Sequence, residues 1–486
     1  MTEDKQLRAP IAEAMKAYAS DGARAFHTPG HKQGLGAHKL LQELITPQGL
    51  REEVSLMEEL DDLHEPTMCI KDAQDLAAEL YGADAAYFMI NGTSGAIHAM
   101  LMGALQPGDK VLVPRNAHRS LIGGLILTGA TPVFIQPRID EELGIPMGLR
   151  YADIAAAVDA NPEARALLLV YPTYYGVAMD LQAAADLVHS RNMLLLVDEA
   201  HGAHFHFSTA LPAQALAAGA DMAAQSTHKI LGSMTQTSML LVRKDRVDVQ
   251  RVREAASLLQ STSPNQLLLA SLDIARLQMA ESGPELVGRA VKLAAELRRE
   301  INKIPGLWSF GADYLPDGES LDITKVTVNL RQLGITGVQA ESILRHEYKI
   351  QCELSDAYNL LFIISYADTA EQTEILLQAL TGLAGRFKGR PKLTLPVRVP
   401  PVPQLGMSPR AAFFAPGEII PFSQAEGRIA AEQIMFYPPG VPLLAPGDVI
   451  DKAALDYIRT MQQLGLKVVG PADSTLQTIK VVRDDR

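Results

Sequence analysis

Between residues 74 and 245, short apolar runs alternate with amphipathic segments rich in alanine and leucine. Two runs, at residues 166–171 and 193–198, contain no polar alternation, as expected of strands buried on both faces. This pattern predicts βαβ units in which helices cover both faces of a mostly parallel sheet. The expected strands of this sheet are residues 85–90, 110–114, 166–172, 193–198, 221–226 and 238–243, with a helix at residues 211–219 before the fifth.

A different pattern follows the sheet region. Residues 244–303 are predicted to form a long helical stretch, and an α+β segment with two strands and two helices comes next. Residues 391–404 are dense in proline, which excludes a helix and predicts a semi-rigid connector. The expected divisions are an N-terminal segment (1–65), a large α/β domain (66–303), a small α+β domain (304–390), the connector (391–404) and a C-terminal domain (405–486).

Composition narrows the class of protein. Hydrophobic residues make up 47% and charged residues 21% of the 486 residues, which is typical of a globular chain of two or three domains. No apolar run approaches the roughly 18 residues of a membrane span, and the first ten residues do not resemble a targeting signal. With only two cysteines, the sequence favours a cytoplasmic protein without a disulfide framework. The net charge of -12 argues against a nucleic-acid partner.

The first candidate for chemistry follows the strand at residues 85–90. The sequence NGTSG supplies Gly92 for a sharp turn and the hydroxyls of Thr93 and Ser94 at the start of a predicted helix. Because a helix N-terminus presents unpaired N–H groups and a positive dipole end, this segment is a candidate phosphate cradle. An ordinary capped helix is an equally good interpretation of the same residues.

Two further strands end in ionisable side chains. His118 follows the strand at 110–114 and could stack on a cofactor ring, although a lone histidine is more often a loop residue. Asp198 ends the strand at 193–198, where a buried carboxylate needs a cationic partner such as a protonated pyridine nitrogen. His201 and His204 with Asp198 are residue types that bind metals, but no general-base motif accompanies them, so we expect no metal site.

The fourth candidate is the sequence STHK, which contains Ser226, His228 and Lys229. By itself, Lys229 would more often be a snorkelling lysine on an amphipathic helix. In a doubly wound sheet, however, the ends of its strand and of the strand before Asp198 lie at the same edge. A lysine amine, a carboxylate, a stacking histidine and a phosphate cradle together predict a site for pyridoxal 5'-phosphate (PLP).

Longer motifs extend this prediction to nearly the whole chain. The sequence resembles the bacterial ornithine/lysine/arginine decarboxylase family, which has the PLP-dependent fold type I, an α/β fold with smaller α+β C-terminal domains. The motifs that carry the resemblance are HTPGHKQG (27–34), LDDLHEPTMCIKDAQDLAAELYGAD (60–84), NGTSG (91–95), RNAHRS (115–120), PTYYGVAMDL (172–181), DEAHGAHF (198–205), STHK (226–229) and YPPGVPLLAPGD (437–448). The chain length is similar to that of short members without an N-terminal wing domain.

The resemblance implies a role for each candidate residue. Lys229 would anchor the cofactor covalently, Asp198 would bind the pyridine nitrogen and His118 would stack on the ring. The phosphate would be held by Thr93, Ser94 and Ser226 with the Gly92 turn, assisted by His228. His201 stands where some longer members have tryptophan, and His201 or His228 could move a proton at Cα.

The implied function is decarboxylation of a basic amino acid, with arginine favoured over lysine and ornithine, to give CO2 and a precursor of di- or polyamines such as agmatine, cadaverine or putrescine. For the distal cation of this substrate, Glu353 and Asp356 are candidates, although both could be surface carboxylates. His27 and His31 are secondary candidates, since the N-terminal segment is expected near the dimer interface and the mouth of the site. The resemblance implies a homodimer or a higher homo-oligomer. The alternatives are a PLP-dependent aminotransferase, an oxygen-using variant on the same scaffold, and a non-catalytic PLP-binding regulator.

Overall fold

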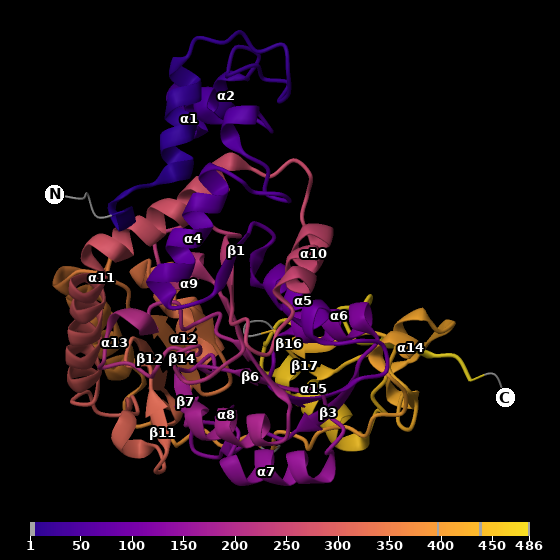
Figure 1. Ribbon diagram of the computed structural model, residues 1–486. Helices are drawn as coiled ribbons and strands as arrows, with labels where there is room; N and C mark the ends of the chain where they lie inside the picture. Colours follow the sequence, from indigo (N-terminus) through magenta and orange to yellow (C-terminus); the bar gives the residue numbers. More distant parts are fainter. Residues whose placement is uncertain (1–4, 396–397, 437–439, 485–486) are drawn as a thin grey trace. The chain divides into compact units, whose positions relative to one another are not determined.

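The computed structural model describes residues 5–395, 398–436 and 440–484. The chain divides into two compact units. The first unit comprises residues 1–104, 196–207 and 214–286, and the second comprises residues 105–195, 208–213 and 287–486. Figure 1 labels the helices and strands of both units.

The first unit contains four strands in the order β1-β10-β9-β8. These strands are β1 (Ala85–Met89), β8 (Leu194–Asp198, of which residues 196–198 belong to this unit), β9 (Met222–Gln225) and β10 (Ser238–Val242). Its helices are α1 (Pro10–Ser20), α2 (Lys39–Leu44), α3 (Pro47–Glu52), α4 (Cys69–Tyr81), α5 (Gly92–Ala104), α9 (Thr227–Ile230), α10 (Val249–Leu259) and the first part of α11 (Gln266–Ile301). Helix α10 packs against α5, and α5 against β10 and β9.

Strand β10 differs from the sequence prediction in its direction. It was expected among the parallel strands, yet it pairs antiparallel with both β1 and β9, whereas β8 and β9 are parallel. The only helix in the connection from β9 to β10 is the four-residue helix α9. A parallel strand would have to begin at the opposite edge of the sheet, and this connection is too short to return the chain to that edge. The first residue of β10 therefore lies at the same sheet edge as the last residue of β9.

Two helix predictions are corrected. Residues 211–219 form turns instead of a helix, because the backbone N–H of Ala215 donates to the carboxylate of Glu199 and the chain reverses at Gly219. The stretch at 244–303 contains two helices, α10 and α11, separated by a segment that includes Pro264. Proline disfavours the helical conformation of the residue before it, which favours a break at this point.

The second unit begins with parallel strands in the order β6-β2-β3. Strands β6 and β2 were predicted, whereas β3 was not among the expected strands. Its strands are β2 (Lys110–Pro114), β3 (Thr131–Ile135), β4 (Ile139–Asp140), β5 (Ile145–Pro146), β6 (Ala166–Val170), β7 (Val177–Met179), β11 (Glu319–Leu321), β12 (Lys325–Asn329), β13 (Leu354–Ser355), β14 (Asn359–Ile363), β15 (Gly417–Pro421), β16 (Ile434–Phe436), β17 (Val441–Leu444), β18 (Val468–Val469) and β19 (Thr478–Val482). Its helices are α6 (Arg119–Thr128), α7 (Tyr151–Ala160), α8 (Leu181–Ser190), α12 (Gly337–Ile343), α13 (Ala370–Phe387), α14 (Pro409–Phe414) and α15 (Lys452–Gln463).

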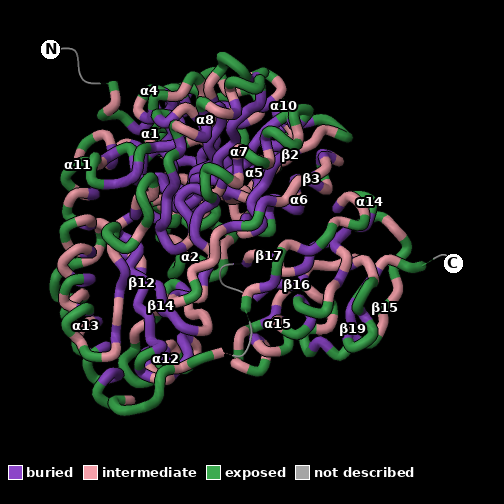
Figure 2. The backbone as a smooth tube through the Cα atoms, turned by 90° about the horizontal axis from the view of Figure 1, so that it is seen from below, coloured by how far each residue is buried: buried purple, intermediate pink, exposed green. Residues whose placement is uncertain are grey.

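Two further cores stabilise the second unit. The antiparallel sheet β12-β14-β13 packs against α12 and α13 around buried residues such as Val328, Leu360 and Leu380. The C-terminal module has the sheet β17-β16-β18 and helix α15 around Ile434 and Ile458. Figure 2 shows β12 and β14 as buried strands, in purple, while α13 exposes green turns. The expected α+β character of this region is confirmed.

Candidate active site

Lys229, Asp198 and His201 come together in the first unit, where the parallel strands β8 and β9 end. Asp198 is the last residue of β8, and Lys229 lies in α9, directly after β9. The Nζ atom of Lys229 lies 3.1 Å from Nε2 of His201. Burial raises the pKa of the Asp198 carboxyl, and the positive charge of Lys229 partly opposes this shift. Lys229 itself is exposed in the single chain, so its amine is accessible to a ligand.

The predicted phosphate cradle forms where β1 leads into α5. Gly92 begins this helix with a φ of 75°, a left-handed conformation that favours glycine. The hydroxyl of Thr93 hydrogen-bonds the hydroxyl of Ser226, and both residues are buried. Ser94 follows on the first turn of the helix and is half-buried. The structure therefore brings the two segments of the cradle together at the positive end of a helix dipole.

The cradle hydroxyls form a chain with a defined direction. Ser238 Oγ donates to the backbone oxygen of Gln225 at 2.6 Å, because a carbonyl oxygen only accepts. The hydroxyl of Thr93, 2.9 Å from Ser238 Oγ, must then donate to Ser238. Its oxygen is consequently the acceptor for the proton of Ser226. Ser226 is the outermost donor of this chain.

Glu199 lies beside Asp198 and is completely buried. Its carboxylate accepts hydrogen bonds from the backbone N–H of Ala215 at 2.7 Å and from the amide of Gln225 at 2.8 Å. Burial nevertheless raises the pKa of Glu199 to about 8. Glu199 thus links the end of β8 to the end of β9, one residue before Ser226.

His228 is turned toward the backbone of its own segment. Its Nδ1 atom donates to the carbonyl oxygen of Thr237 at 2.7 Å. Because a carbonyl oxygen only accepts, Nδ1 is the ring nitrogen that carries the proton. Burial lowers the pKa of His228, and the charge of Lys229 lowers it further. His228 is therefore neutral at pH 7, with Nε2 as an acceptor.

His118 belongs to the second unit, in the loop between β2 and α6. It is the N-cap of α6, and its Nδ1 atom accepts a hydrogen bond from the backbone N–H of Ser120 at 3.2 Å. The proton of the neutral ring is therefore on Nε2. Arg115, Asn116 and the other residues of this loop lie at the carboxyl end of β2, where the sequence predicted them.

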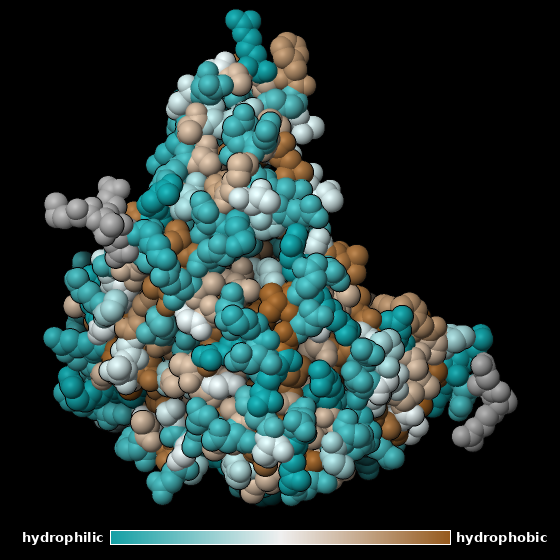
Figure 3. Space-filling model, viewed as in Figure 1, coloured by the Kyte–Doolittle hydropathy of each residue, from teal (hydrophilic) through white to brown (hydrophobic). Residues whose placement is uncertain are grey.

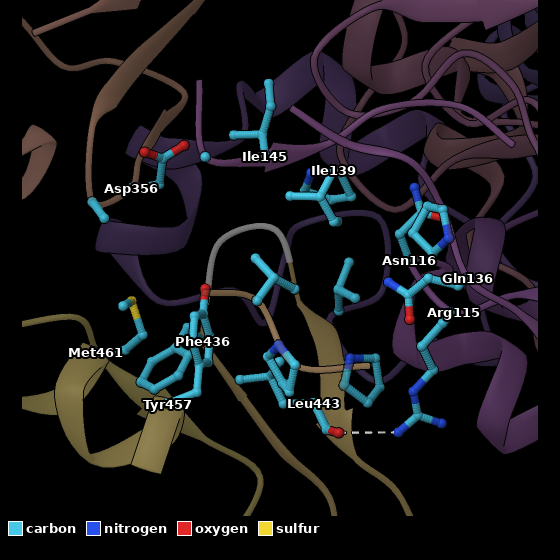
Figure 4. A pocket seen from close by; sticks show the side chains of 18 of the residues that line it. Arg115, Asn116, Gln136, Ile139, Ile145, Asp356, Phe436, Leu443, Tyr457 and Met461 are labelled. Carbon is cyan, nitrogen blue, oxygen red and sulfur yellow. Dashed lines mark hydrogen bonds between the residues drawn. The ribbon is translucent and has the colours of Figure 1, made fainter. Parts of the chain in front are cut away.

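Glu353 and Asp356 line two separate cavities in the second unit. Asp356 faces a cavity of about 160 Å³, opposite Arg115 and Gln136 (Figure 4). Its carboxylate already accepts hydrogen bonds from Tyr175 Oη and the backbone N–H of Asn359, at 2.7 and 2.8 Å. Most of the lining is apolar, with Ile139, Ile145, Phe436, Leu443 and Met461. Glu353 is exposed beside the other cavity, of about 560 Å³, and accepts the hydroxyl proton of Tyr174.

His27 and His31 form hydrogen bonds within the N-terminal segment. His27 Nε2 lies 2.9 Å from the hydroxyl of Tyr18. His31 Nδ1 accepts from the backbone N–H of Gly34, so its Nε2–H donates to Glu53 at 2.8 Å. These contacts stabilise the turn HTPGHKQG, and both histidines stay candidates for the mouth of the site.

The residues of the first unit fit PLP. A helix N-terminus with buried hydroxyls suits a phosphate, and the buried Asp198 suits a protonated ring nitrogen. Lys229 supplies an accessible amine at the adjacent strand end.

Within the described ranges, no three histidine, cysteine, aspartate or glutamate side chains are grouped as metal ligands. None of the helices there has the length and apolarity that a bilayer span requires.

Two residues of this site, Ser238 and Glu199, had no predicted role. Ligands are expected at the carboxyl ends of parallel strands, whereas Ser238 is the first residue of an antiparallel strand. Glu199 is part of the motif DEAHGAHF. Its position as a second carboxylate directly after an apolar run is the sequence feature that could have predicted its place in the site. The residues Tyr437, Pro438 and Pro439 of YPPGVPLLAPGD lie outside the described residues.

Comparison with protein families gives two matches on this chain. Residues 9–317 match the model of the "Orn/Lys/Arg decarboxylase, major domain", and residues 399–475 match that of the "Orn/Lys/Arg decarboxylase, C-terminal domain".

Individual relatives agree with these matches. The chain is 45% identical to an arginine decarboxylase of Halalkalibacterium halodurans, over 99% of both chains. It is 42% identical to an arginine decarboxylase of Bacillus subtilis, again over 99% of both. The structure of a lysine decarboxylase from Francisella novicida superposes with a TM-score of 0.85, covering 99% of this chain and 82% of the other at 21% identity. The predicted fold type is therefore confirmed.

Proposed function

Since the chain belongs to the Orn/Lys/Arg decarboxylase family, we propose that it removes the α-carboxylate of arginine and releases CO2 and agmatine. The protein is a decarboxylase with PLP as its cofactor. Arginine is proposed because two relatives that share 45% and 42% identity with this chain, over 99% of both sequences, are arginine decarboxylases, and lysine and ornithine come next. The observation that carries the proposal is the placement of Lys229, Asp198 and His201 at adjacent parallel strand ends.

Each of these residues has a distinct task. Lys229 holds the cofactor through its amine, and Asp198 keeps the ring nitrogen protonated by offering a buried negative charge. Bound PLP supplies the electron sink for the electron pair that the departing carboxylate leaves behind. His201, in hydrogen-bond contact with Lys229 Nζ, is placed to deliver a proton at Cα of the substrate.

The remaining residues bind and orient. Ser226, together with Thr93, Ser94 and the turn at Gly92, holds the phosphate, while His228 keeps the segment before Lys229 in place through Thr237. His118 is proposed to cover one face of the ring.

The distal cation of the substrate needs a carboxylate. Glu353 is the better candidate, because it is exposed beside an open cavity and its carboxylate accepts a hydrogen bond from Tyr174. Asp356 is already hydrogen-bonded by Tyr175 and Asn359, so its charge is largely satisfied by its own surroundings. A guanidinium group would bind Glu353 through two parallel hydrogen bonds.

The experiment offers arginine, lysine and ornithine, each labelled at the α-carboxyl carbon, to the purified PLP-loaded protein. The proposal expects labelled CO2 and the matching amine, fastest from arginine, and no product from Lys229→Ala. A keto acid instead of an amine would indicate an aminotransferase. Retention of bound PLP without turnover of any of the three would indicate a regulator, and consumption of O2 with substrate would indicate the oxygen-using variant.

The proposal includes a homodimer. Seven large apolar side chains in the described part of the N-terminal segment are exposed in the single chain, which is typical of a surface that a second copy covers. They are Leu7, Phe26, Leu35, Leu40, Leu41, Leu44 and Leu56. Figure 3 shows brown side chains among the hydrophilic ones in this segment, around α1 and α2. Burial of these residues would contribute several kcal/mol of apolar association, on the order of 2 kcal/mol for each.

Analytical ultracentrifugation tests this surface. The double variant Leu35→Glu/Leu44→Glu is expected to sediment as a monomer, whereas Leu258→Glu, an exposed leucine of α10, leaves the dimer intact. An unchanged dimer in the double variant would place the interface elsewhere.

Location in the cytoplasm belongs to the same proposal, because both cysteines, Cys69 and Cys352, are free thiols. Release of the activity with cytosolic markers on cell fractionation would support it.

A further inference from the structure

We propose that Asp448 of the C-terminal module is a positioning residue that fixes the loop carrying His118 by holding Arg115. This inference rests on the proposed function, in which His118 covers the cofactor ring. It gives a task to the motif YPPGVPLLAPGD, whose last residue is Asp448. All residues that carry the argument lie in the second unit.

A buried ion pair joins two motifs that are far apart in the sequence. Arg115 Nη2 donates to Asp448 Oδ2, and the two side chains are only 9% and 1% exposed. The same nitrogen donates to the backbone oxygen of Leu443 at 3.1 Å, as the dashed line in Figure 4 shows. Both acceptors belong to the C-terminal module, so the hydrogen bonds of the guanidinium group hold it to that module.

Asp448 is itself held firmly by the module. Its carboxylate accepts a hydrogen bond from the backbone N–H of Ala445 at 2.7 Å. Its backbone N–H donates to the oxygen of Ala445 at 3.1 Å, and its backbone oxygen accepts from Ala430 at 2.9 Å. The position of the carboxylate is therefore defined by the backbone of the module, as a positioning group requires.

The loop with His118 is attached to the module on both sides of the histidine. On one side, Arg115 contacts Asp448, and its Cζ atom lies 4.6 Å from the centre of the Phe134 ring. On the other side, the backbone N–H of Arg119 donates to the oxygen of Gly440 at 3.2 Å. Since His118 lies between these two attachments, a shift of the module would shift its ring.

Stability alone is a poor reason for such a pair. Removing two charges from water costs much of what their attraction returns, and apolar residues of similar size often serve as well or better. An ion pair specifies a geometry, however, since the guanidinium group meets its acceptors at fixed angles. Positioning therefore explains the use of a charged pair at this boundary better than docking does.

The test measures the dissociation constant of PLP for the full-length protein and the visible circular dichroism of the bound cofactor. Asp448→Asn is expected to weaken PLP binding roughly tenfold, a change of about 1.4 kcal/mol, and to alter the dichroism. In a His118→Ala background, the same substitution is expected to change the dissociation constant less than about twofold, because the residue through which it acts is absent.

Asp473→Ala is the matched control in the same module. The Asp473 carboxylate accepts hydrogen bonds from the backbone N–H groups of Thr475 and Thr478, at 3.0 and 2.9 Å, and it does not touch the His118 loop. This variant is expected to lower the stability of the module in urea and leave PLP affinity and dichroism unchanged.

Three outcomes would overturn the inference: no effect of Asp448→Asn, an equal effect with and without His118, or the same loss of affinity in Asp473→Ala. If wild-type protein failed to bind PLP, the proposed function itself would be wrong. If His118→Ala had no effect while wild type bound PLP, the role of His118 in the proposed function would be wrong, and this inference with it.

Discussion

Lys229 and His201 are in direct contact, with 3.1 Å between Nζ and Nε2. The two residues come from the segments that follow neighbouring parallel strands, β9 and β8. The contact places an imidazole beside the amine that is proposed to hold the cofactor. It also supports the proposed role of His201, which the sequence left open, as a group that delivers a proton at the substrate Cα.

The first prediction concerns His201. His201→Gln is expected to lower kcat on the order of 100-fold, because a general acid is lost, while the PLP content of the protein stays unchanged. Steady-state kinetics and the visible absorbance of the purified variant measure both quantities. His189→Gln, which alters a histidine on α8, is the control and should retain full activity. A variant of His201 with normal kcat would assign the proton to another group.

The second prediction concerns the pH dependence of stability through Glu199. Its pKa is about 8 in the folded state and 4.5 ordinarily, so between these values the folded state keeps a proton that the unfolded state releases. The free energy of unfolding contributed by this group is therefore present at acid pH and declines as pH rises to about 8. Glu199→Gln resembles the protonated form and removes this decline.

Urea unfolding at acid and alkaline pH measures this effect. At about pH 5 the variant should match wild type, and at about pH 9 it should be more stable, since each pKa unit corresponds to roughly 1.4 kcal/mol. Glu285→Gln, which replaces an exposed carboxylate of α11, is the control and should not change the profile. Equal stability of wild type and Glu199→Gln at alkaline pH would contradict the assignment.

The third prediction follows from the direction of the hydroxyl chain. Ser226 ends this chain, and its hydroxyl can turn its one proton from Thr93 to a bound phosphate, so Ser226→Ala is expected to weaken PLP binding by about tenfold to 100-fold, the usual cost of a lost hydrogen bond to an anion. Pyridoxal lacks the phosphate and serves as the matched ligand. Its affinity should not change, and isothermal titration of the apoprotein with both ligands measures the difference. Equal losses for the two ligands would mean that Ser226 acts on the fold instead of on the phosphate.

The fourth prediction concerns the loop before α4. The buried carboxylate of Asp61 accepts backbone N–H groups of Thr67, Met68 and Ile70, at 2.9, 2.8 and 3.1 Å. Asp61→Ala leaves these donors without an acceptor and is expected to cost about 3 kcal/mol of unfolding free energy. Thermal and urea unfolding measure this loss. Asp72→Ala, an exposed acid in the first turn of the same helix, should cost well under 1 kcal/mol, or about 0.5 kcal/mol.

The sequence by itself determined the α/β class and the strands that end at Asp198 and before Lys229. It could do so because burial on both faces of a parallel sheet leaves unbroken apolar runs, and because ligands gather at the carboxyl ends of such strands. The α+β segment was also recoverable, since helices α12 and α13 and strands β12 and β14 follow local patterns.

Only the tertiary structure decided the remaining contacts. The antiparallel direction of β10 places Ser238 beside Thr93. The pattern of apolar residues along a strand does not indicate in which direction the strand runs through the sheet. Turns replace the predicted helix at residues 211–219, because the carboxylate of Glu199, distant in sequence, accepts a hydrogen bond from the backbone N–H of Ala215. The pair Arg115–Asp448 joins residues 333 positions apart. Local sequence reports which face of a segment avoids water, but partners in a buried hydrogen bond are chosen by how segments distant in the chain pack together.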